Sequence, residues 1–176
     1  MQIPTALAYS CNCFVAHFAE RLAPGELESH LKRYGFGSRS GWFGGAEAPG
    51  RVQRTSTVES QQLQAIGEGA VLVTAAALTR AYCRLALSAA EPIRSGLEGA
   101  VEYGTAQEAR VAGIKVAGKT GSVRAADGAM IAWFAGFAPS RAPTAVVAVM
   151  LQGRSGGADA APIGGRILSA HLTGRI

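Results

Sequence analysis

The heptapeptide Val116-Ala117-Gly118-Lys119-Thr120-Gly121-Ser122 stands where the hydrophobic pattern of this 176-residue chain changes. Most apolar residues before it recur at helical spacing, whereas the runs around and after it alternate with a period of two, which is typical of strands. One more helical pattern closes the chain. Helices, then an antiparallel sheet, then a terminal helix covering that sheet predict an α+β fold.

The helical predictions rest on apolar spacing and on the breakers between segments. Pro24-Gly25 separates the first two segments, and Thr74 is a suitable N-cap for the third. Residues 35–62 are rich in Gly, Ser, Arg and Gln and show no period, so we expect an irregular surface excursion there. The predicted helices are 13–23, 24–34, 74–88, 92–103 and 158–172, the last with Ile163, Ile167 and Leu168 facing inward.

Three runs with strand-like alternation, 114–117, 131–138 and 144–151, are separated by turn signals. Their connections are short enough for antiparallel neighbours. This assignment places Lys119 just after a strand. The length favours a single domain over residues 1–176, with a mainly helical part over 1–104 and the strands and terminal helix over 105–176.

Composition excludes several classes of protein. The chain is 48% apolar and 16% charged, which argues against disorder and predicts a soluble globular domain. No run of 18 apolar residues occurs, and the first ten residues lack the pattern of a secretory signal. The net charge is +5, but the arginines that dominate it are scattered rather than clustered, so we expect no nucleic-acid partner.

The cysteines raise a second possibility. Cys11, Cys13 and Cys83 are an odd number and suggest no disulfide framework. Cys11 and Cys13 with His17 could be read as three metal ligands, but no fourth ligand is evident. Packing of small cysteines at the start of an apolar helix is the favoured interpretation. The sequence therefore predicts neither a metal nor a cofactor.

Two short motifs carry candidate chemistry, and each is weak alone. Ser10-Cys11-Asn12 opens the first predicted helix, where Ser10 and Asn12 would also suit a helix cap and a turn. Lys119-Thr120-Gly121-Ser122 would also suit an ordinary glycine turn. Together, in this order, they resemble two of the three motifs of penicillin-recognising serine enzymes.

The resemblance extends along most of the chain. It is to the C-terminal part of the transpeptidase domain of penicillin-binding proteins, within the serine D,D-peptidase and β-lactamase-like superfamily. It implies a partial form of that α+β fold. The phrases that carry it stand in the family's order: A-Y-S-C-N-C-F at 8–14, Y-G-F-G at 34–37, I-G-E-G at 66–69 with Val73-Thr74 and Ala81-Tyr82, V-E-Y-G-T-A at 101–106, V-A-G-K-T-G-S at 116–122 and W-F-A-G-F-A-P at 133–139.

The resemblance implies a catalytic role for two residues. The family attacks a D-Ala-D-Ala amide, or a β-lactam that mimics it, with a serine activated by a lysine one helical turn later, and forms an acyl-enzyme. By this resemblance Ser10 would relay a proton to the leaving nitrogen. Lys119 would supply positive potential for the substrate carboxylate and tune Ser10.

Four further residues would bind the substrate by the same resemblance. Asn12 would hydrogen-bond the peptide chain, and the hydroxyls of Thr120 and Ser122 would bind the terminal carboxylate. The Ser122 backbone N–H would be one oxyanion donor. Gly121 would let the substrate backbone approach the strand edge.

The nucleophile motif S-x-x-K is the departure from the family. It belongs several dozen residues before Ser10, which is preceded by nine residues here. The sequence has one literal match, Ser29-His30-Leu31-Lys32. It follows Ser10 instead of preceding it, and a single match of so short a motif can arise by chance. We therefore expect a C-terminal fragment that lacks its own nucleophile, so that enzymatic activity of this chain alone stays open.

A non-catalytic pseudoenzyme that binds stem peptides or acts as a scaffold is the alternative. The short path from Ser88 to Pro92, where the family inserts a hairpin, favours it slightly. A third reading is reuse of the fold in an unrelated role. The family implies peptidoglycan stem peptides or β-lactams as ligands, and other cell-wall synthesis proteins or the missing N-terminal part of the domain as partners. It also implies an extracytoplasmic location, in the periplasm or on the outer face of the cytoplasmic membrane.

Overall fold

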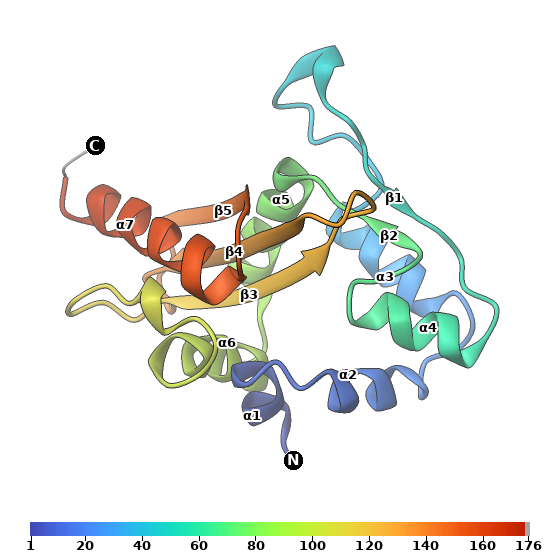
Figure 1. Ribbon diagram of the computed structural model, residues 1–176. Coiled ribbons are helices and arrows are strands. Elements are labelled where there is room, and N and C mark those ends of the chain that lie inside the picture. The colour runs from blue at the N-terminus through green and yellow to red at the C-terminus, as the bar shows by residue number, and fades with distance from the viewer. Residues whose placement is uncertain (175–176) are drawn as a thin grey trace. The chain divides into compact units, whose positions relative to one another are not determined.

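The computed structural model describes residues 1–174, and the chain divides into two compact units (Figure 1). Unit 1 joins residues Met1–Ser10 to the part of the chain that begins at Tyr82, and unit 2 is Cys11–Ala81. The long helix α5 (Ala75–Ser88) belongs to unit 2 at its start and to unit 1 at its end. The prediction of one domain with a division after residue 104 stays a prediction.

The sheet of unit 1 has three antiparallel strands in the order β3-β4-β5. They are β3 (Ala117–Arg124), β4 (Met130–Ala138) and β5 (Ala145–Gln152). Lys119 lies opposite Ala135 in the register of the first pair. In the part of the chain that the structure describes, β3 and β5 each have one strand neighbour, so the outer edge of each is open.

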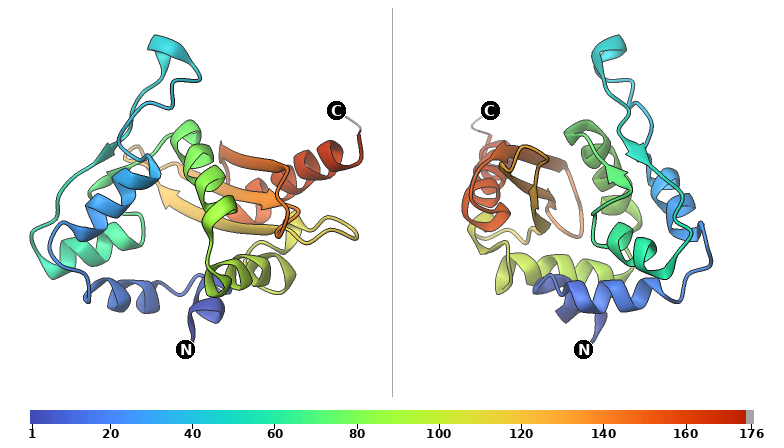
Figure 2. Two further views of the ribbon diagram at one scale, coloured as in Figure 1. Left: turned by 180° about the vertical axis from the view of Figure 1, so that it is seen from behind. Right: turned by 45° about the vertical axis from the view of Figure 1, so that its right-hand side comes forward.

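Side chains of β4 alternate between two apolar layers, as a sheet covered on both faces requires. Phe134 packs in a layer with Leu168 of helix α7 (Ala161–Leu172). Phe137 packs in the other layer with Leu97 of helix α6 (Glu91–Glu102) and with the end of α5. Both phenylalanines are fully buried, which is worth about 1.5–3 kcal/mol each. The two views of Figure 2 show the helices on the two faces of the sheet.

Three short elements complete unit 1. Helix α1 (Ile3–Ala8) packs against α6, and two glycines of that region allow the close approach. A Cβ at Gly96 would lie 2.8 Å from the Leu7 side chain, and one at Gly104 would lie 2.1 Å from the Ala8 carbonyl oxygen. A 3₁₀ turn follows α6 at Gln107–Ala109, and a π-helical turn at Gly156–Ala160 leads into α7.

Unit 2 is helical and has a small apolar core. Its helices are α2 (Asn12–Ala19), α3 (Glu26–Tyr34) and α4 (Val58–Ala65), and its sheet is one pair of two-residue strands, β1 (Arg51–Val52) and β2 (Val71–Leu72). α3 buries none of its residues. The buried apolar residues of unit 2 are Val52 and three alanines: Ala19, Ala77 and Ala81.

Buried polar side chains tie unit 2 together instead. The Gln61 amide donates to the carbonyl of Ala19 (2.6 Å), the last residue of α2, and to the carbonyl of Leu22 (3.0 Å) in the turn that follows. The Arg80 guanidinium donates to the carbonyls of Gly35, Ser38 and Arg39. Such side-chain to backbone bonds contribute about 1 kcal/mol each, and they replace apolar packing here.

Residues 38–50, which we call the finger, project from the helices of unit 2 (Figure 1). The buried carboxylate of Glu47 closes their base by accepting from the backbone N–H groups of Ser40 (2.6 Å) and Gly41 (3.0 Å). Desolvation raises the pKa of Glu47, but the hydrogen bonds and the nearby Arg80 charge outweigh it, so the pKa lies below its usual value. The finger exposes Trp42 and Phe43.

The α+β prediction is confirmed, but several boundaries are wrong. The first predicted helix, α2, ends at Ala19 rather than at residue 23, because the Gln61 amide donates to the Ala19 carbonyl and the chain turns there. The excursion predicted over 35–62 contains β1 and the start of α4. A reciprocal capping box between Thr57 and Ser60 starts α4, and the sequence analysis missed that signal.

The predicted strand at 114–117 is also wrong. Val111 and Ile114 form an isolated bridge, and the Lys115 carbonyl accepts from the backbone of Ser140 instead of continuing a ladder. Ile167 was predicted to face inward and is 42% exposed. The buried residues of α7 are Ala161, Gly164, Gly165 and Leu168, and a Cβ would clash with the Phe134 ring at Gly164 and with the Ala109 backbone at Gly165.

Helices long and apolar enough to cross a membrane are absent from residues 1–174.

The guanidinium of Arg80 provides a test of how unit 2 is held together. We expect Arg80→Met to speed amide hydrogen exchange over residues 35–50 about tenfold, because about 1–2 kcal/mol of local hydrogen bonding is lost. Exchange in β4 should not change. Hydrogen exchange read by mass spectrometry measures both. Arg51→Met, at an exposed position of β1, is the matched control and should have no effect on either region.

Candidate functional site

The motif Lys119-Thr120-Gly121-Ser122 lies within β3, at an edge of the sheet, and not after a strand as predicted. Strand alternation puts Lys119 and Gly121 toward one face and Thr120 and Ser122 toward the other. Lys119 and Thr120 are half-buried, and Ser122 is exposed. The open edge of β3 therefore presents backbone hydrogen-bonding groups between an ammonium group and a hydroxyl.

Lys119 is an unusual cation because no carboxylate balances it among the described residues. Its Nζ donates to the Thr120 carbonyl oxygen at 3.0 Å. Burial lowers the pKa of Lys119 to about 8, so most of the ammonium remains charged at pH 7. A half-buried positive charge without a counter-ion attracts an anion more strongly than an exposed lysine would.

The two hydroxyls of the motif are held by other elements of unit 1. Thr120 Oγ1 donates to Thr105 Oγ1 at 2.7 Å. Ser122 Oγ accepts from the backbone N–H of Gly156 at 3.0 Å. In the described part of the chain the Ser122 proton has no acceptor, whereas the Thr120 proton is used. Ser122 is thus the hydroxyl that can donate to an added anion.

Gly121 has no packing reason to be glycine. A Cβ there would lie 3.4 Å from the Trp133 Cβ, an ordinary contact, and its φ is not positive. Gly118, two residues earlier, differs: a Cβ there would lie 2.6 Å from the buried Phe134 ring. The small size of Gly121 is thus not required by the fold, and it keeps the strand edge accessible.

Ser10 is the one non-glycine residue with positive φ in the described chain, at 55°. This left-handed conformation costs about 1–2 kcal/mol and occurs mostly at functional positions. The Ser10 hydroxyl makes no hydrogen bond within residues 1–174. The N-cap of α2 is Cys11, with no side-chain bond, so the helix-cap interpretation of Ser10 does not hold. Asn12 is exposed at the first position of α2, in unit 2, and its amide is unbonded there.

A chain of two hydrogen bonds links the segment before Ser10 to β3. The backbone N–H of Thr105 donates to the Ala8 carbonyl at 3.1 Å, and the Thr105 hydroxyl accepts from Thr120. The rings of Tyr9 and Tyr103 stand 5.8 Å apart beside this link. The motif strand β3 and the residues just before Ser10 are thereby tied to the turn after α6.

The serine and lysine of the literal S-x-x-K match have other partners. Ser29 Oγ donates to the Gly25 carbonyl at 2.9 Å, within the first turn of α3. Lys32 Nζ pairs with Glu28 Oε1 at 2.6 Å. Each side chain is bonded to another group, so this pair lacks the hydrogen bond between serine and lysine that activates a nucleophile.

No group of three or more His, Cys, Asp or Glu side chains that could hold a metal occurs within residues 1–174. Cys11, Cys13 and Cys83 are free thiols. Burial raises the pKa of Cys83, which makes its thiol less reactive. What the β3 edge offers chemically is recognition of an anion beside an extended peptide backbone.

Comparison with known proteins decides the family. The sequence profile of the penicillin binding protein transpeptidase domain matches residues 1–169. The chain belongs to this family. Members of the family bind β-lactams and peptidoglycan substrates, and the family works outside the cytoplasm. The resemblance inferred from the sequence phrases is thereby confirmed.

The relatives are similar at low identity. Stage V sporulation protein D of Bacillus subtilis (strain 168) is 28% identical over 212 aligned positions, which cover 93% of this chain and 33% of that protein. The chain thus spans about a third of this relative's length. The alignment has more positions than the chain has residues, so the relative carries residues inside the aligned region that this chain lacks.

Two solved structures share the fold. The transpeptidase domain of the FtsI4 D,D-transpeptidase of Legionella pneumophila is 26% identical with a TM-score of 0.74, and the match covers 96% of this chain and 69% of that one. Pseudomonas aeruginosa PBP2 in complex with WCK 5153 is 23% identical with a TM-score of 0.86, covering 96% and 48%.

Sequence reasoning missed two residues that position the motif. Thr105 was part of a quoted phrase, but nothing in its neighbours indicated that it would join Ala8 to Thr120. Gly156 follows β5, and a Cβ there would lie 2.4 Å from the carbonyl oxygens of Gly121 and Trp133. Its close approach to β3 depends on tertiary packing, and an isolated Gly-Gly pair is a weak signal.

The contrast between two glycines of β3 gives a paired prediction. Gly121→Ala should change the free energy of unfolding by no more than about 0.5 kcal/mol, since its Cβ meets nothing closely. Gly118→Ala should cost about 1–3 kcal/mol because its Cβ overlaps the Phe134 ring. Urea unfolding measures both. Equal costs for the two variants would contradict this account of Gly121.

The lysine pKa values can be measured directly because the chain has three lysines. With ¹³Cε-labelled lysine we expect the Lys119 signal to titrate near pH 8. Lys115, whose pKa the Glu102 carboxylate raises, is the internal control and should titrate well above it. If Lys119 titrated at the same pH as Lys115 or at a higher pH, burial would not lower the pKa of Lys119.

Proposed function

We propose that this chain is the carboxylate-binding part of a penicillin-sensitive D,D-transpeptidase site, which recognises the D-Ala-D-Ala end of peptidoglycan stem peptides and β-lactams. The observation that carries the proposal is the half-buried, uncompensated ammonium of Lys119 at the open edge of β3. A terminal carboxylate placed there would accept from the Ser122 hydroxyl and would be attracted by the positive charge of Lys119 on the other face of the strand. Thr120 then acts as a positioning residue through its bond to Thr105.

The edge of β3 accounts for the peptide part of the substrate. An extended peptide adds to an open strand edge through backbone hydrogen bonds, and Gly121 keeps that edge free of a side chain. The Ser122 N–H is the oxyanion donor in this arrangement. Asn12 would bind the amide of the peptide chain.

Ser10 is proposed as the group that returns a proton to the leaving nitrogen. Its strained backbone and its unbonded hydroxyl support a role other than helix capping. The link from Ala8 through Thr105 to Thr120 holds the preceding residues of unit 1 to the motif strand. Proton transfer to the leaving amine completes cleavage of the D-Ala-D-Ala amide as the acyl-enzyme forms.

Formation of the acyl-enzyme needs a nucleophile, and we propose that this chain does not supply it. The sequence has one S-x-x-K, and both of its side chains have other partners. An S-x-x-K serine on another polypeptide segment would then attack the substrate that this chain holds. The resulting site would be extracytoplasmic, where peptidoglycan is assembled.

A binding module without turnover is the second candidate. Two residues, Ala89 and Ala90, connect α5 to α6, where the family inserts a hairpin, and the Bacillus relative carries residues that are absent here. An internal loss of this kind favours a chain that has been reduced to recognition. Both candidates require the same carboxylate site on β3.

The first test is the intact mass of the chain after incubation with a fluorescent penicillin, followed by NMR titration with the same compound. We expect no covalent adduct, and saturable shifts at Thr120, Gly121 and Ser122. Lys119→Met should weaken this binding at least tenfold, because the half-buried positive charge that attracts the carboxylate is lost. Lys32→Met, in α3, is the control and should bind as the unchanged chain does.

The pH dependence has a definite sign. Lys119 is protonated below its pKa of about 8, so affinity for the anionic penicillin should be highest below pH 7 and should fall as the pH rises through 8. An adduct mapped to Ser10 or Ser29 would overturn the absence of a nucleophile. Absence of shifts in β3 would overturn the carboxylate site.

A further inference from the structure

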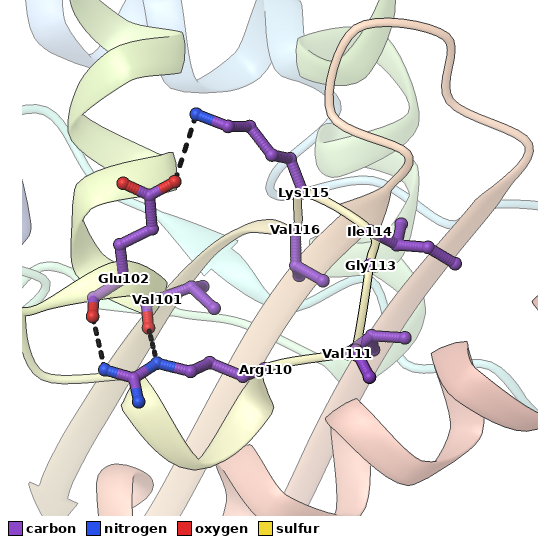
Figure 3. Close-up of a pocket in the computed structure, with 9 residues that line it drawn as sticks. Val101, Glu102, Arg110, Val111, Gly113, Ile114, Lys115 and Val116 are labelled. Carbon is purple, nitrogen blue, oxygen red and sulfur yellow. Dashed lines mark hydrogen bonds and ion pairs between the residues drawn. The ribbon is translucent and has the colours of Figure 1, made fainter.

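A pocket of about 310 Å³ lies in unit 1 between the end of α6 and the loop that leads into β3 (Figure 3). Its lining comes from Val101 and Glu102 of α6 and from residues 110–116. None of the residues of the proposed transpeptidase site lines it. The volume is at the low end for ligand pockets, so it suits one side chain with its flanking backbone rather than a large ligand.

The walls of this pocket are aliphatic. Val101, Val111 and Val116 are buried members of the unit 1 core, and Ile114 is half-buried against them. Gly113, with φ of 72°, turns the chain between Val111 and Ile114, so that both side chains reach the pocket. An aliphatic side chain of a ligand would bury apolar area here at about 25 cal/mol per Å².

Arg110 forms one side of the pocket and is held rigidly. Its Nε donates to the Val101 carbonyl at 3.2 Å, and its Nη2 donates to the Glu102 carbonyl and to Gln107 Oε1 at 2.8 Å. A guanidinium has five N–H donors, and these bonds use three. The two donors on Nη1 have no acceptor in the described part of the chain. A fixed guanidinium with unused donors is suited to bind a carboxylate.

Lys115 lies on the opposite side of the aliphatic side chains (Figure 3). Its Nζ pairs with Glu102 Oε1 at 3.1 Å and stands 3.9 Å from Glu98 Oε2. The Glu98 carboxylate is buried and bonded to Ser140, whereas the Lys115 side chain is 63% exposed and has donors to spare. The lining has two cations and one carboxylate, so it carries a net positive charge.

We propose that this pocket binds a segment of a partner protein in which one aliphatic side chain is flanked by acidic residues on both sides. The aliphatic side chain would enter between Val111 and Val116. The two carboxylates would reach Arg110 and Lys115, which stand on opposite sides of it. The proposal is independent of the proposed transpeptidase function, because no residue of the β3 motif takes part.

Binding here would act on the start of β3. Val116 lines the pocket and is followed directly by Ala117, the first residue of the strand. Lys119 is three residues after Val116, about 10 Å along an extended chain. A partner that fills the pocket would thus restrain the strand that carries the motif.

The test is an NMR titration of the full 176-residue chain with the peptide acetyl-Glu-Leu-Glu-amide. We expect the backbone shifts to concentrate at residues 110–116. The isosteric peptide acetyl-Gln-Leu-Gln-amide should bind about tenfold more weakly, because both charge pairs are lost. A peptide with Gly in place of Leu should also bind about tenfold more weakly, since the aliphatic contact is removed.

Variants assign the effect to the two cations. Arg110→Gln and Lys115→Gln should each reduce the affinity severalfold, and Lys115→Gln is exposed enough to keep the fold if Arg110→Gln does not. Arg124→Gln, the same change of charge at the far end of β3, is the matched control and should bind normally. Shifts away from residues 110–116, equal binding of the charged and amide peptides, or unchanged binding by Lys115→Gln would each overturn the proposal.

Discussion

The ring of Phe134 is the constraint on which the sheet of unit 1 depends. It lies against three glycines, and a Cβ at Gly118, Gly136 or Gly164 would come within 2.3–2.8 Å of it. These glycines belong to β3, β4 and α7, so one side chain determines how closely three elements pack. Because interiors are close-packed, a methyl group at any of these positions would displace its element. Lys119 follows Gly118 directly, and its position therefore depends on this contact.

A polar link holds the same strand at Thr120, two residues after Gly118. Thr105 Oγ1 accepts a hydrogen bond from the Thr120 hydroxyl, and the Thr105 backbone N–H donates to the Ala8 carbonyl. The half-buried location of these groups makes an unpaired partner costly, so the link holds the turn after α6 in a single arrangement. The motif strand is thus fixed by apolar packing on Phe134 and by hydrogen bonds through Thr105. Its outer edge is left open.

The two units are stabilised in different ways. Unit 1 is stabilised by apolar residues buried around its sheet. Unit 2 has a small apolar core, and the side chains of Gln61, Arg80 and Glu47 form hydrogen bonds with its backbone groups. This difference accounts for one phrase of the family resemblance, Y-G-F-G at 34–37. Gly35 has a φ of 102°, and a Cβ there would lie 2.5 Å from Arg80 Nε, so the Y-G-F-G phrase and the helix that carries Arg80 need each other.

The amino-acid sequence was sufficient to predict the fold class, the family resemblance and the residues of the candidate site. Periodicity is a local property, so the helices at 74–88 and 92–103 and the strands at 131–138 and 144–151 were predicted within about two residues. The same periodicity wrongly placed Lys119 after a strand and Ile167 in the core. A local pattern shows neither the Lys115–Ser140 hydrogen bond nor the buried glycines of α7. Three features emerge only from the folded arrangement of residues 1–174: Lys119 lacks a carboxylate partner, Ser122 rather than Thr120 has a hydroxyl without an acceptor, and Arg110 has two unused donors beside an aliphatic pocket. Charge balance, hydrogen-bond partners and burial arise from residues distant in sequence, and they exist only once the chain has folded.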